Sequence, residues 1–338
     1  MKPLMIVAII LICVGLLVAF FALLSVKFDV RLFSSVQYEE KEAVIADSFS
    51  DISISLDTSE VKILPATDDT VRIVYDDPKP EKMSVDISVK DGKLTVSLQD
   101  TRKWYEKISI FNFGRHEVVI YLPAGAYGAL DLRLSTGKIA VEKGLTFAAA
   151  SIVRSTGDLD FGATITGEMN ILSTTGETML SGSVGSLKLK STTGDVRLFD
   201  LTVLGSMEIT RTTGDLVILR TAAADVNLKG STGDVEANTM TVTGDMSITS
   251  TTGEIELAHT VIGGHLEIVS DTGDVELERS DAATLKITTD TGDVSGSLLT
   301  DKQFFAHSDT GRVRVPKTTG GLCEIDTDTG NIDFLGED

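Results

Sequence analysis

The sequence predicts an all-β protein built as a parallel β-solenoid of 19–20-residue coils. Three observations predict this fold. A Thr-Gly pair preceded by Ser, Thr or Asp recurs at nearly constant intervals, and apolar and polar residues alternate around each pair. Aromatic residues make up only 6% of the chain, whereas glycines number 30. This composition is typical of short aliphatic and β-branched strands separated by tight turns.

The repeat is defined by eleven glycines, whose successive spacings are 20, 19, 18, 20, 19, 20, 20, 19, 19 and 19 residues. We predict a corner at each one, because glycine adopts positive φ where a Cβ would clash. The predicted structural turns are Gly137, Gly157, Gly176, Gly194, Gly214, Gly233, Gly253, Gly273, Gly292, Gly311 and Gly330. A second group of glycines punctuates several units between these corners: Gly185, Gly205, Gly244, Gly264 and Gly321.

Two topologies compete for such a repeat. Within Ser186–Leu201, apolar and polar residues alternate on both sides of the Thr-Thr-Gly turn, which indicates strands with one buried face. A propeller blade needs about 40 residues and four strands, so the short unit fits a propeller poorly. A unit this short buries its apolar face only by stacking on its neighbours, which favours the solenoid. Eleven coils at about 4.8 Å each predict a rod of roughly 50 Å.

In-register stacking places the residue after each glycine in a ladder of mostly acidic side chains. Carboxylates about 4.8 Å apart repel by roughly 0.9 kcal/mol in water before screening, so something must offset the repulsion. Hydrogen bonds from backbone N–H groups are the main interpretation, and no cofactor is expected. Bound Ca²⁺ is the alternative, although the calcium-binding repeat and loop motifs are absent. The candidate metal ligands are Asp195, Asp215, Asp234, Asp274 and Asp293.

The amino-terminal segment Leu4–Val26 contains no charged residue and one glycine. Twenty-three helical residues span roughly 35 Å, which is enough to cross the hydrocarbon core of a membrane. The run is longer than a signal-peptide core, and no clear Ala-x-Ala site follows it. We therefore predict an uncleaved, single-pass transmembrane helix, with the solenoid outside the cell. A cleaved signal peptide is the alternative, and the flanking charges give almost no orientation signal.

Four regions follow from these patterns. Residues 1–31 form the predicted anchor, residues 32–43 a juxtamembrane linker, residues 44–127 an irregular β cap with the first coils, and residues 128–338 the regular repeats. In the cap, Asp91-Gly92 predicts a hairpin, and Ile54–Ile63 reads as a degenerate repeat with serine in place of glycine. An aromatic cluster interrupts the pattern and is expected to pack over the core or to contact a partner: Trp104, Tyr105, Phe111 and Phe113.

Charge and motifs exclude several functions. The net charge is −20, and subtracting the +2 of residues 1–31 leaves −22 for residues 32–338, which repels nucleic acid. The histidines lack metal-pair spacing, and no nucleophile elbow, Walker loop or dinucleotide motif occurs. Cys13 and Cys323 lie too far apart in the sequence for a bridge between them to be plausible. We expect no enzyme activity.

Several units carry a recognisable signature: residues 155–159 (Ser-Thr-Gly-Asp-Leu), 192–196 (Thr-Thr-Gly-Asp-Val), 231–235 (Ser-Thr-Gly-Asp-Val) and 271–275 (Asp-Thr-Gly-Asp-Val). Together with Glu117–Pro123 before the first regular coil, they resemble the bacterial putative-adhesin β-strand-repeat family, domain of unknown function 4097. The resemblance covers about residues 45–335. It implies a surface protein, and some relatives are linked to envelope stress responses.

The leading hypothesis is a non-catalytic, membrane-anchored surface solenoid that acts as an adhesin-like scaffold or interaction protein. Its partner would be a protein or a cell-wall glycan, and the membrane would be contacted through the amino-terminal helix. One alternative is a regulatory or sensory component of the envelope stress response that binds a membrane partner. A carbohydrate-active β-helix enzyme is another, although the constant intervals leave no loops to build a cleft. A self-assembling filament is a further alternative.

Overall fold

The computed structural model describes residues 37–79, 83–101 and 117–334, together with five helical residues between Val14 and Phe21. Within these residues no helix is both long and apolar enough to cross a membrane. Most of the predicted span Leu4–Val26 lies outside the described residues, so the anchor stays a prediction. The aromatic cluster of Trp104, Tyr105, Phe111 and Phe113 also lies outside them.

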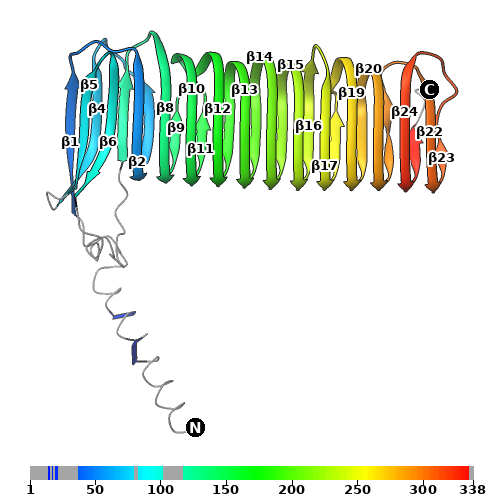
Figure 1. The fold of residues 1–338 in the computed structure, drawn as a ribbon, viewed down its shortest axis with the longest axis horizontal. Coiled ribbons are helices and arrows are strands. Elements are labelled where there is room, and N and C mark those ends of the chain that lie inside the picture. The colour runs from blue at the N-terminus through cyan, green and yellow to red at the C-terminus, as the bar shows by residue number, and fades with distance from the viewer. Residues whose placement is uncertain are drawn as a thin grey trace, which may run out of the picture.

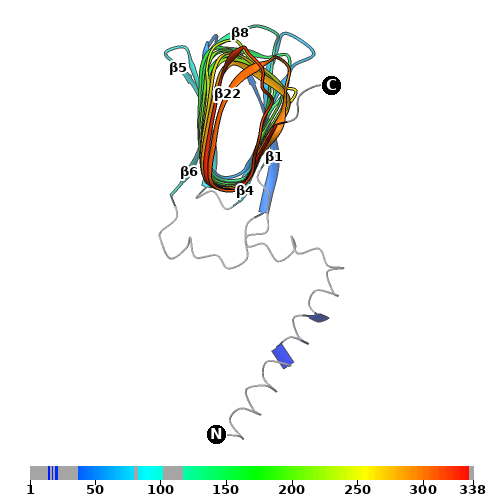
Figure 2. The same ribbon diagram turned by 90° about the vertical axis from the view of Figure 1, so that its right-hand side faces the viewer.

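The predicted parallel β-solenoid is confirmed. Figure 1 shows the strands stacked side by side along a rod, and Figure 2 shows a flattened, oval cross-section. Twelve strands end at a threonine, and each of these threonines directly precedes a corner. They are β2 (Asp51–Thr58), β8 (Ala126–Thr136), β10 (Thr146–Thr156), β12 (Thr164–Thr175), β13 (Thr178–Thr193), β14 (Val196–Thr213), β15 (Leu216–Thr232), β17 (Met246–Thr252), β19 (Val261–Thr272), β20 (Val275–Thr291), β22 (Lys302–Thr310) and β24 (Gly321–Thr329).

Other strands begin just after a corner and run back along the opposite side of the oval. They are β3 (Glu60–Pro65), β9 (Ile139–Val141), β11 (Leu159–Phe161), β16 (Val235–Val242), β18 (Ile255–Ala258), β21 (Val294–Leu298), β23 (Val313–Arg314) and β25 (Ile332–Phe334). In β13, β14, β15 and β20 this segment continues without a break into the next corner-ending strand. One winding therefore has a corner at glycine and further bends on the far side.

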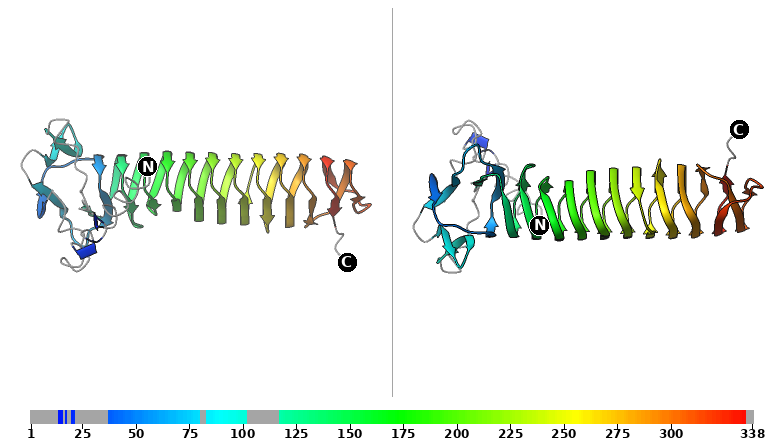
Figure 3. Two further views of the ribbon diagram at one scale, coloured as in Figure 1. Left: turned by 90° about the horizontal axis from the view of Figure 1, so that it is seen from below. Right: turned by 90° about the horizontal axis from the view of Figure 1, so that it is seen from above.

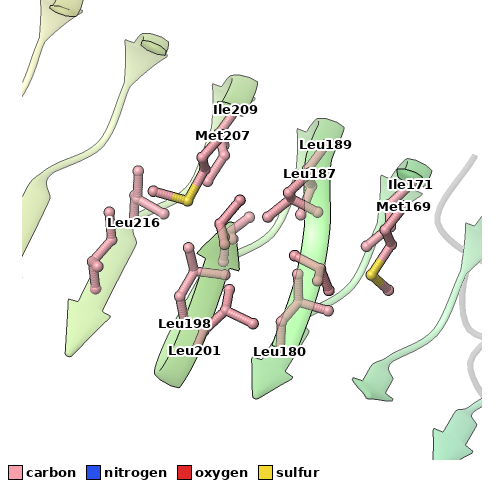
Figure 4. Close-up of a cluster of buried hydrophobic side chains, with 14 of the residues drawn as sticks. Met169, Ile171, Leu180, Leu187, Leu189, Leu198, Leu201, Met207, Ile209 and Leu216 are labelled. Atoms are coloured by element: carbon pink, nitrogen blue, oxygen red, sulfur yellow. The ribbon is translucent and has the colours of Figure 1, made fainter. Parts of the chain in front are cut away.

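The core is a column of aliphatic side chains from successive windings. Leu189 pairs in register with Ile209, and Ile209 pairs with Leu228, and all three are buried. Figure 4 shows side chains from several neighbouring strands converging between the two long sides of the oval. Because every winding buries its apolar face on the windings beside it, the core is continuous along the rod. Figure 3 shows how evenly the strands repeat.

The amino-terminal end of the rod is covered by antiparallel strands. β1 (Gln37–Ile45) pairs with β4 (Val71–Lys79), which pairs with β7 (Glu117–Leu122). β5 (Met83–Lys90) and β6 (Lys93–Asp100) form the hairpin predicted at Asp91-Gly92, where φ is 53° and 74°. β1 carries Glu39, Glu40, Lys41 and Glu42, and such charges on an edge strand discourage pairing with another chain.

The predicted degenerate repeat is a true winding. β2 and β3 form it, and Ser59 occupies the corner that glycine occupies elsewhere. The Ser59 N–H donates to the Thr136 carbonyl at 3.0 Å, which stacks this winding on the next one. On its other side, β2 pairs with β6 and β3 pairs with β7. The first winding is thus separated in sequence from the second by the cap.

The carboxy-terminal windings are not stacked in sequence order. β24 pairs with β20 on one side and with β22 on the other, and β25 pairs likewise with β21 and β23. Residues 321–334 therefore lie between the windings that precede them, and residues 302–314 form the end of the rod. The insertion buries Cys323, Ile325, Ile332 and Phe334 almost completely.

Replacing Gly214 tests the corner geometry. Its φ is 124°, and a Cβ would lie 2.6 Å from the carbonyl carbon of Gly194. We expect Gly214→Ala to lower the free energy of unfolding by about 1–3 kcal/mol, because the residue must either hold a strained φ or push the neighbouring winding away. Urea unfolding followed by circular dichroism measures the change. Gly125→Ala is the matched control, since a Cβ there meets nothing within 4 Å. Equal stability of the two variants would contradict the corner geometry.

Candidate functional site

The corners bring the predicted turn glycines into one line along the rod. All of them except Gly311 have positive φ between 118° and 157°. At every one of these corners except Gly311, the glycine N–H donates to the threonine carbonyl of a neighbouring winding, as Gly214 does to Thr232 at 3.1 Å. The backbones approach so closely here that no side chain fits between them. The corner line is therefore the tightest part of the coil stack.

The acidic residues after the corner glycines form the ladder that the repeat predicted, and their carboxylates are hydrogen-bonded. Asp195 Oδ1 accepts the N–H of Asp215 at 3.1 Å, and Asp215 Oδ1 accepts the N–H of Asp234 at 3.0 Å. Asp234 accepts from Glu254 at 2.9 Å. At the carboxy-terminal end, Asp274 accepts from Asp293 at 2.8 Å, and Asp293 accepts from Asn331 at 2.7 Å. Each carboxylate thus binds the backbone of the next winding, which offsets its repulsion from neighbouring acids.

Two glutamates interrupt this pattern. Glu177 instead pairs with Arg197, and Glu254 only donates its own N–H to Asp234. Among the residues that the structure describes, no three Asp, Glu, His or Cys side chains are grouped closely enough to hold a metal ion.

A second column of acidic side chains lies two residues further along each winding than the corner ladder. Glu236, Glu256 and Glu276 are register partners on successive windings. Partial burial, followed by repulsion from Glu236 and Glu276, raises the pKa of the Glu256 carboxyl. Glu254 and Glu278 also lie near Glu256, so this stretch is a concentrated negative surface.

A shallow groove of about 510 Å³ begins at this acidic stretch and runs toward the end of the rod. The basic residues on its rim are Arg312 and Arg314, and Arg314 lies 3.5 Å from Asp333. Small side chains on β21, such as Ser295, leave the surface hollow here. The groove is therefore open and lined by residues of both charges.

The opposite flank of the corner carries hydroxyls. The threonine before each corner is exposed, and Thr193, Thr213 and Thr232 are register partners on successive windings. The residue before each of these threonines is a second exposed Ser, Thr or Asp, for example Thr192 and Thr212. Two parallel columns of polar side chains therefore follow the corner, with a repeat of about 4.8 Å.

Two arginine side chains that are buried inside the rod donate hydrogen bonds to backbone carbonyls at the corners. Arg154 Nη2 donates to the Glu177 carbonyl at 2.8 Å, and Arg211 Nη2 donates to the Gly233 carbonyl at 3.1 Å. Burial lowers the pKa of Arg154 to about 10, so it remains charged at neutral pH. Serine stands at the equivalent position of neighbouring windings, such as Ser173 and Ser191. The repeat pattern gives no signal that these two arginines point inward.

A corner that the sequence did not predict lies on the far side of the oval. Asp200, Arg220, Thr239, His259 and Arg279 occupy equivalent places there, with φ between 46° and 57°. Asp200 and Arg220 form a two-pronged ion pair, with an Nε–Oδ1 distance of 2.7 Å. The hydrogen bond to Arg220 lowers the pKa of the exposed Asp200 carboxyl. The predicted second glycine group lies one bend further on, without positive φ.

The other polar groups do not form a catalytic arrangement within the described residues. His265 Nδ1 contacts the Thr284 hydroxyl at 2.8 Å, and His307 Nε2 contacts Asp309 at 3.0 Å. Both contacts are local, and no Ser or Cys nucleophile is paired with either ring. Burial raises the pKa of the Cys323 thiol to about 12, which keeps it protonated and unreactive.

These features define a repeat protein of the parallel β-solenoid class, in which every winding contributes the same corner. The chain belongs to the Toastrack DUF4097 family, which matches residues 49–238 and 204–334. This confirms the resemblance found in the Thr-Gly-Asp units. No curated protein matches the sequence.

Several solved structures are similar to the chain. A putative adhesin from Parabacteroides distasonis is 13% identical, with 86% of this chain and 97% of that chain covered and a TM-score of 0.38. A putative lipid binding protein from the same species is 11% identical, with 88% and 97% covered and a TM-score of 0.39. A putative adhesin from Parabacteroides merdae is 16% identical, with 90% and 98% covered and a TM-score of 0.31.

Removing one carboxylate tests the hydrogen-bonded ladder. We expect Asp215→Ala to lower the free energy of unfolding by about 0.5–1.5 kcal/mol, because the Asp234 N–H loses its acceptor. Asp215→Asn should restore most of this loss, since its amide oxygen can accept the same hydrogen bond. Glu254→Ala is the matched control and should change stability by less than about 0.5 kcal/mol, because its carboxylate accepts no N–H of the next winding.

Calcium provides a second readout of the same ladder. With the carboxylates already bound to backbone N–H groups, the melting temperature should be the same in calcium and in chelator. A calcium-dependent rise that Asp215→Asn and Asp234→Asn abolish would show that the alternative, a cation ladder, is correct.

Proposed function

We propose that the protein is a non-catalytic, membrane-anchored scaffold at the cell surface, with an adhesin-like role. The solenoid would project from the membrane and bind a protein or a cell-wall glycan. The observation that carries the proposal is the regularity of the stack. The long strands from β8 to β20 all end at the same corner, and the corner glycines are 18–20 residues apart.

Regular stacking gives the rod repeated surface positions rather than a single pocket. The exposed hydroxyl columns beside the corner and the acidic column on the other flank recur about every 4.8 Å. A partner that is itself repetitive can contact several windings at once, so weak single contacts add up. A catalytic cleft would need long loops on one face, which the described windings do not carry. The proposal requires no cofactor.

The anchor and the membrane side are tested together. The full chain should sediment with membranes and resist carbonate extraction, whereas a chain lacking residues 1–31 should not. For the side, Thr212→Cys in a Cys13→Ser background places a thiol on the exposed corner. A membrane-impermeant maleimide should label this variant in intact cells. Cys323 serves as the internal control, because its buried thiol should stay unlabelled.

Labelling only after cell lysis would place the solenoid inside the cell and overturn the surface role. Release of the full chain by carbonate would instead indicate that residues 4–26 do not span the membrane. The labelling result reports on which side of the membrane the solenoid lies, and the carbonate result reports how the protein is attached to the membrane.

Contact through repeated hydroxyls is tested by co-sedimentation of the full chain with isolated bacterial cell walls. The triple variant Thr212→Ala, Ser231→Ala and Thr251→Ala should bind severalfold less than each single variant, since avidity depends on several windings. The matched control replaces three polar residues of the same windings away from the corner: Ser206→Ala, Asn227→Ala and Ser247→Ala. Equal binding by both triple variants would exclude the hydroxyl columns as the contact surface.

A further inference from the structure

The carboxy-terminal end of the rod contains a slot that its own last winding fills. Residues 321–334 follow residues 302–314 in sequence but lie beneath them in the stack. In Figure 1, β24 lies between β20 and β22, and β22 and β23 end the rod. The chain therefore leaves the position next to β20 open and forms the terminal winding with residues 302–314. It then returns to fill the open position, the slot, with residues 321–334.

Hydrogen bonds hold the inserted winding on both sides. Toward the body of the rod, Gly292 N–H donates to the Thr329 carbonyl at 2.9 Å. Toward the end, Gly330 N–H donates to the Thr310 carbonyl at 3.1 Å. The Asn331 side chain contacts Asp293 on one side and accepts the Arg312 N–H at 3.1 Å on the other. The slot is thus an in-register site for one particular coil.

The corner chemistry does not dictate this order. The spacings from Gly292 to Gly311 and from Gly311 to Gly330 are both 19 residues, so stacking in sequence order would also align the threonines. In the observed order Ile325, Ile332 and Phe334 are at most 2% exposed in the slot, and Val313 of the terminal winding is 44% exposed. Burial of the aliphatic and aromatic side chains in the slot stabilises the inserted winding.

A buried ion pair bridges the inserted winding. Lys302 Nζ on β22 lies 2.7 Å from Asp281 Oδ1 on β20, and both residues are at most 9% exposed. The Thr300 hydroxyl donates to Asp281 Oδ2 and accepts from the lysine. At Gly321 a Cβ would lie 2.3 Å from the backbone oxygen of Ala283, so β24 approaches β20 too closely here for a side chain. The pair joins the windings on either side of the slot whichever copy of residues 321–334 fills it.

The return link is short and lies at an end with exposed apolar side chains. Residues 315–320 connect β23 to β24, and about seven Cα steps span at most about 25 Å. Of the large apolar side chains that are exposed in the regular windings, several gather at this end: Leu299, Phe305, Val313 and Leu322.

We propose that this end is a coil-exchange site, at which residues 321–334 of a second copy enter the slot and join two rods end to end. The occupant is specified by the slot, since a second copy carries the segment that already fits it. The exchanged dimer keeps the hydrogen bonds and burial of the single chain, which makes exchange a low-cost route to a dimer. The proposal does not depend on the membrane anchor or on the surface role.

The order of the windings is tested first, in full-length protein carrying Cys13→Ser. Leu285 and Cys323 are inward-facing register partners on adjacent strands, and parallel strands about 4.8 Å apart are within reach of a disulfide. We expect Leu285→Cys to form a disulfide with Cys323 during oxidative refolding. Leu266→Cys is the matched control, one winding further along the same column, and should stay reduced. A reduced Leu285→Cys variant would overturn the inserted order and the proposal with it.

Exchange is then tested with two chains that each carry a single cysteine and so cannot form a disulfide within one chain. One carries Cys13→Ser, Leu285→Cys and Cys323→Ser, and the other carries Cys13→Ser alone. After co-refolding, we expect a covalent heterodimer on a non-reducing gel. Deleting residues 317–319 in both chains should raise its share severalfold, and inserting three glycines into the link should lower it. Leu266→Cys in place of Leu285→Cys should give none.

Absence of the heterodimer from chains whose circular dichroism shows the folded solenoid would overturn the exchange site. If the chains with the shortened link do not fold, the comparison between the native and the lengthened link still tests the exchange. A heterodimer whose share does not fall when the link is lengthened would equally contradict exchange.

Discussion

The structure depends on one constraint, the in-register stacking of each winding on the next. At the glycine corners from Gly137 to Gly292 and at Gly330, the glycine N–H bonds to a carbonyl of the neighbouring winding, and the two backbones come too close for a Cβ. This contact fixes the register, and the register determines which side chains of successive windings are aligned. It aligns Leu189, Ile209 and Leu228 inside the rod and aligns the threonines and carboxylates outside it. A winding removed from its neighbours would lose both its core and its hydrogen bonds.

Stacking also explains why an acidic rod tolerates a row of carboxylates. An aspartate after the corner is short enough to bind the N–H directly above it, so its charge strengthens the stack. The same position occupied by Glu177 or Glu254 makes no such bond, which shows that side-chain length decides the outcome. The ladder is thus a structural device, and the surfaces available to a partner are the hydroxyl columns and the acidic column beside it.

The repeat, the corners and the acidic ladder could be predicted because stacking imposes one residue type at one interval. The far corner could not, since residues as different as Asp200, Arg220 and Thr239 adopt the same positive φ there. The inward direction of Arg154 and Arg211 could not be predicted either, because serine occupies the equivalent position in neighbouring windings. The order of the last windings escaped prediction for a different reason: the equal spacing of the corner glycines fits both orders.

The central claim is tested most directly by deleting whole and half windings. Removing residues 254–273 joins Gly253 to Asp274 and restores the motif, so the shortened rod should unfold cooperatively with nearly the same melting temperature. Removing residues 254–263 alone shifts the following windings out of register and should abolish cooperative unfolding. Comparable melting of the two deletions, or loss of the fold in the whole-winding deletion, would contradict the stacking account.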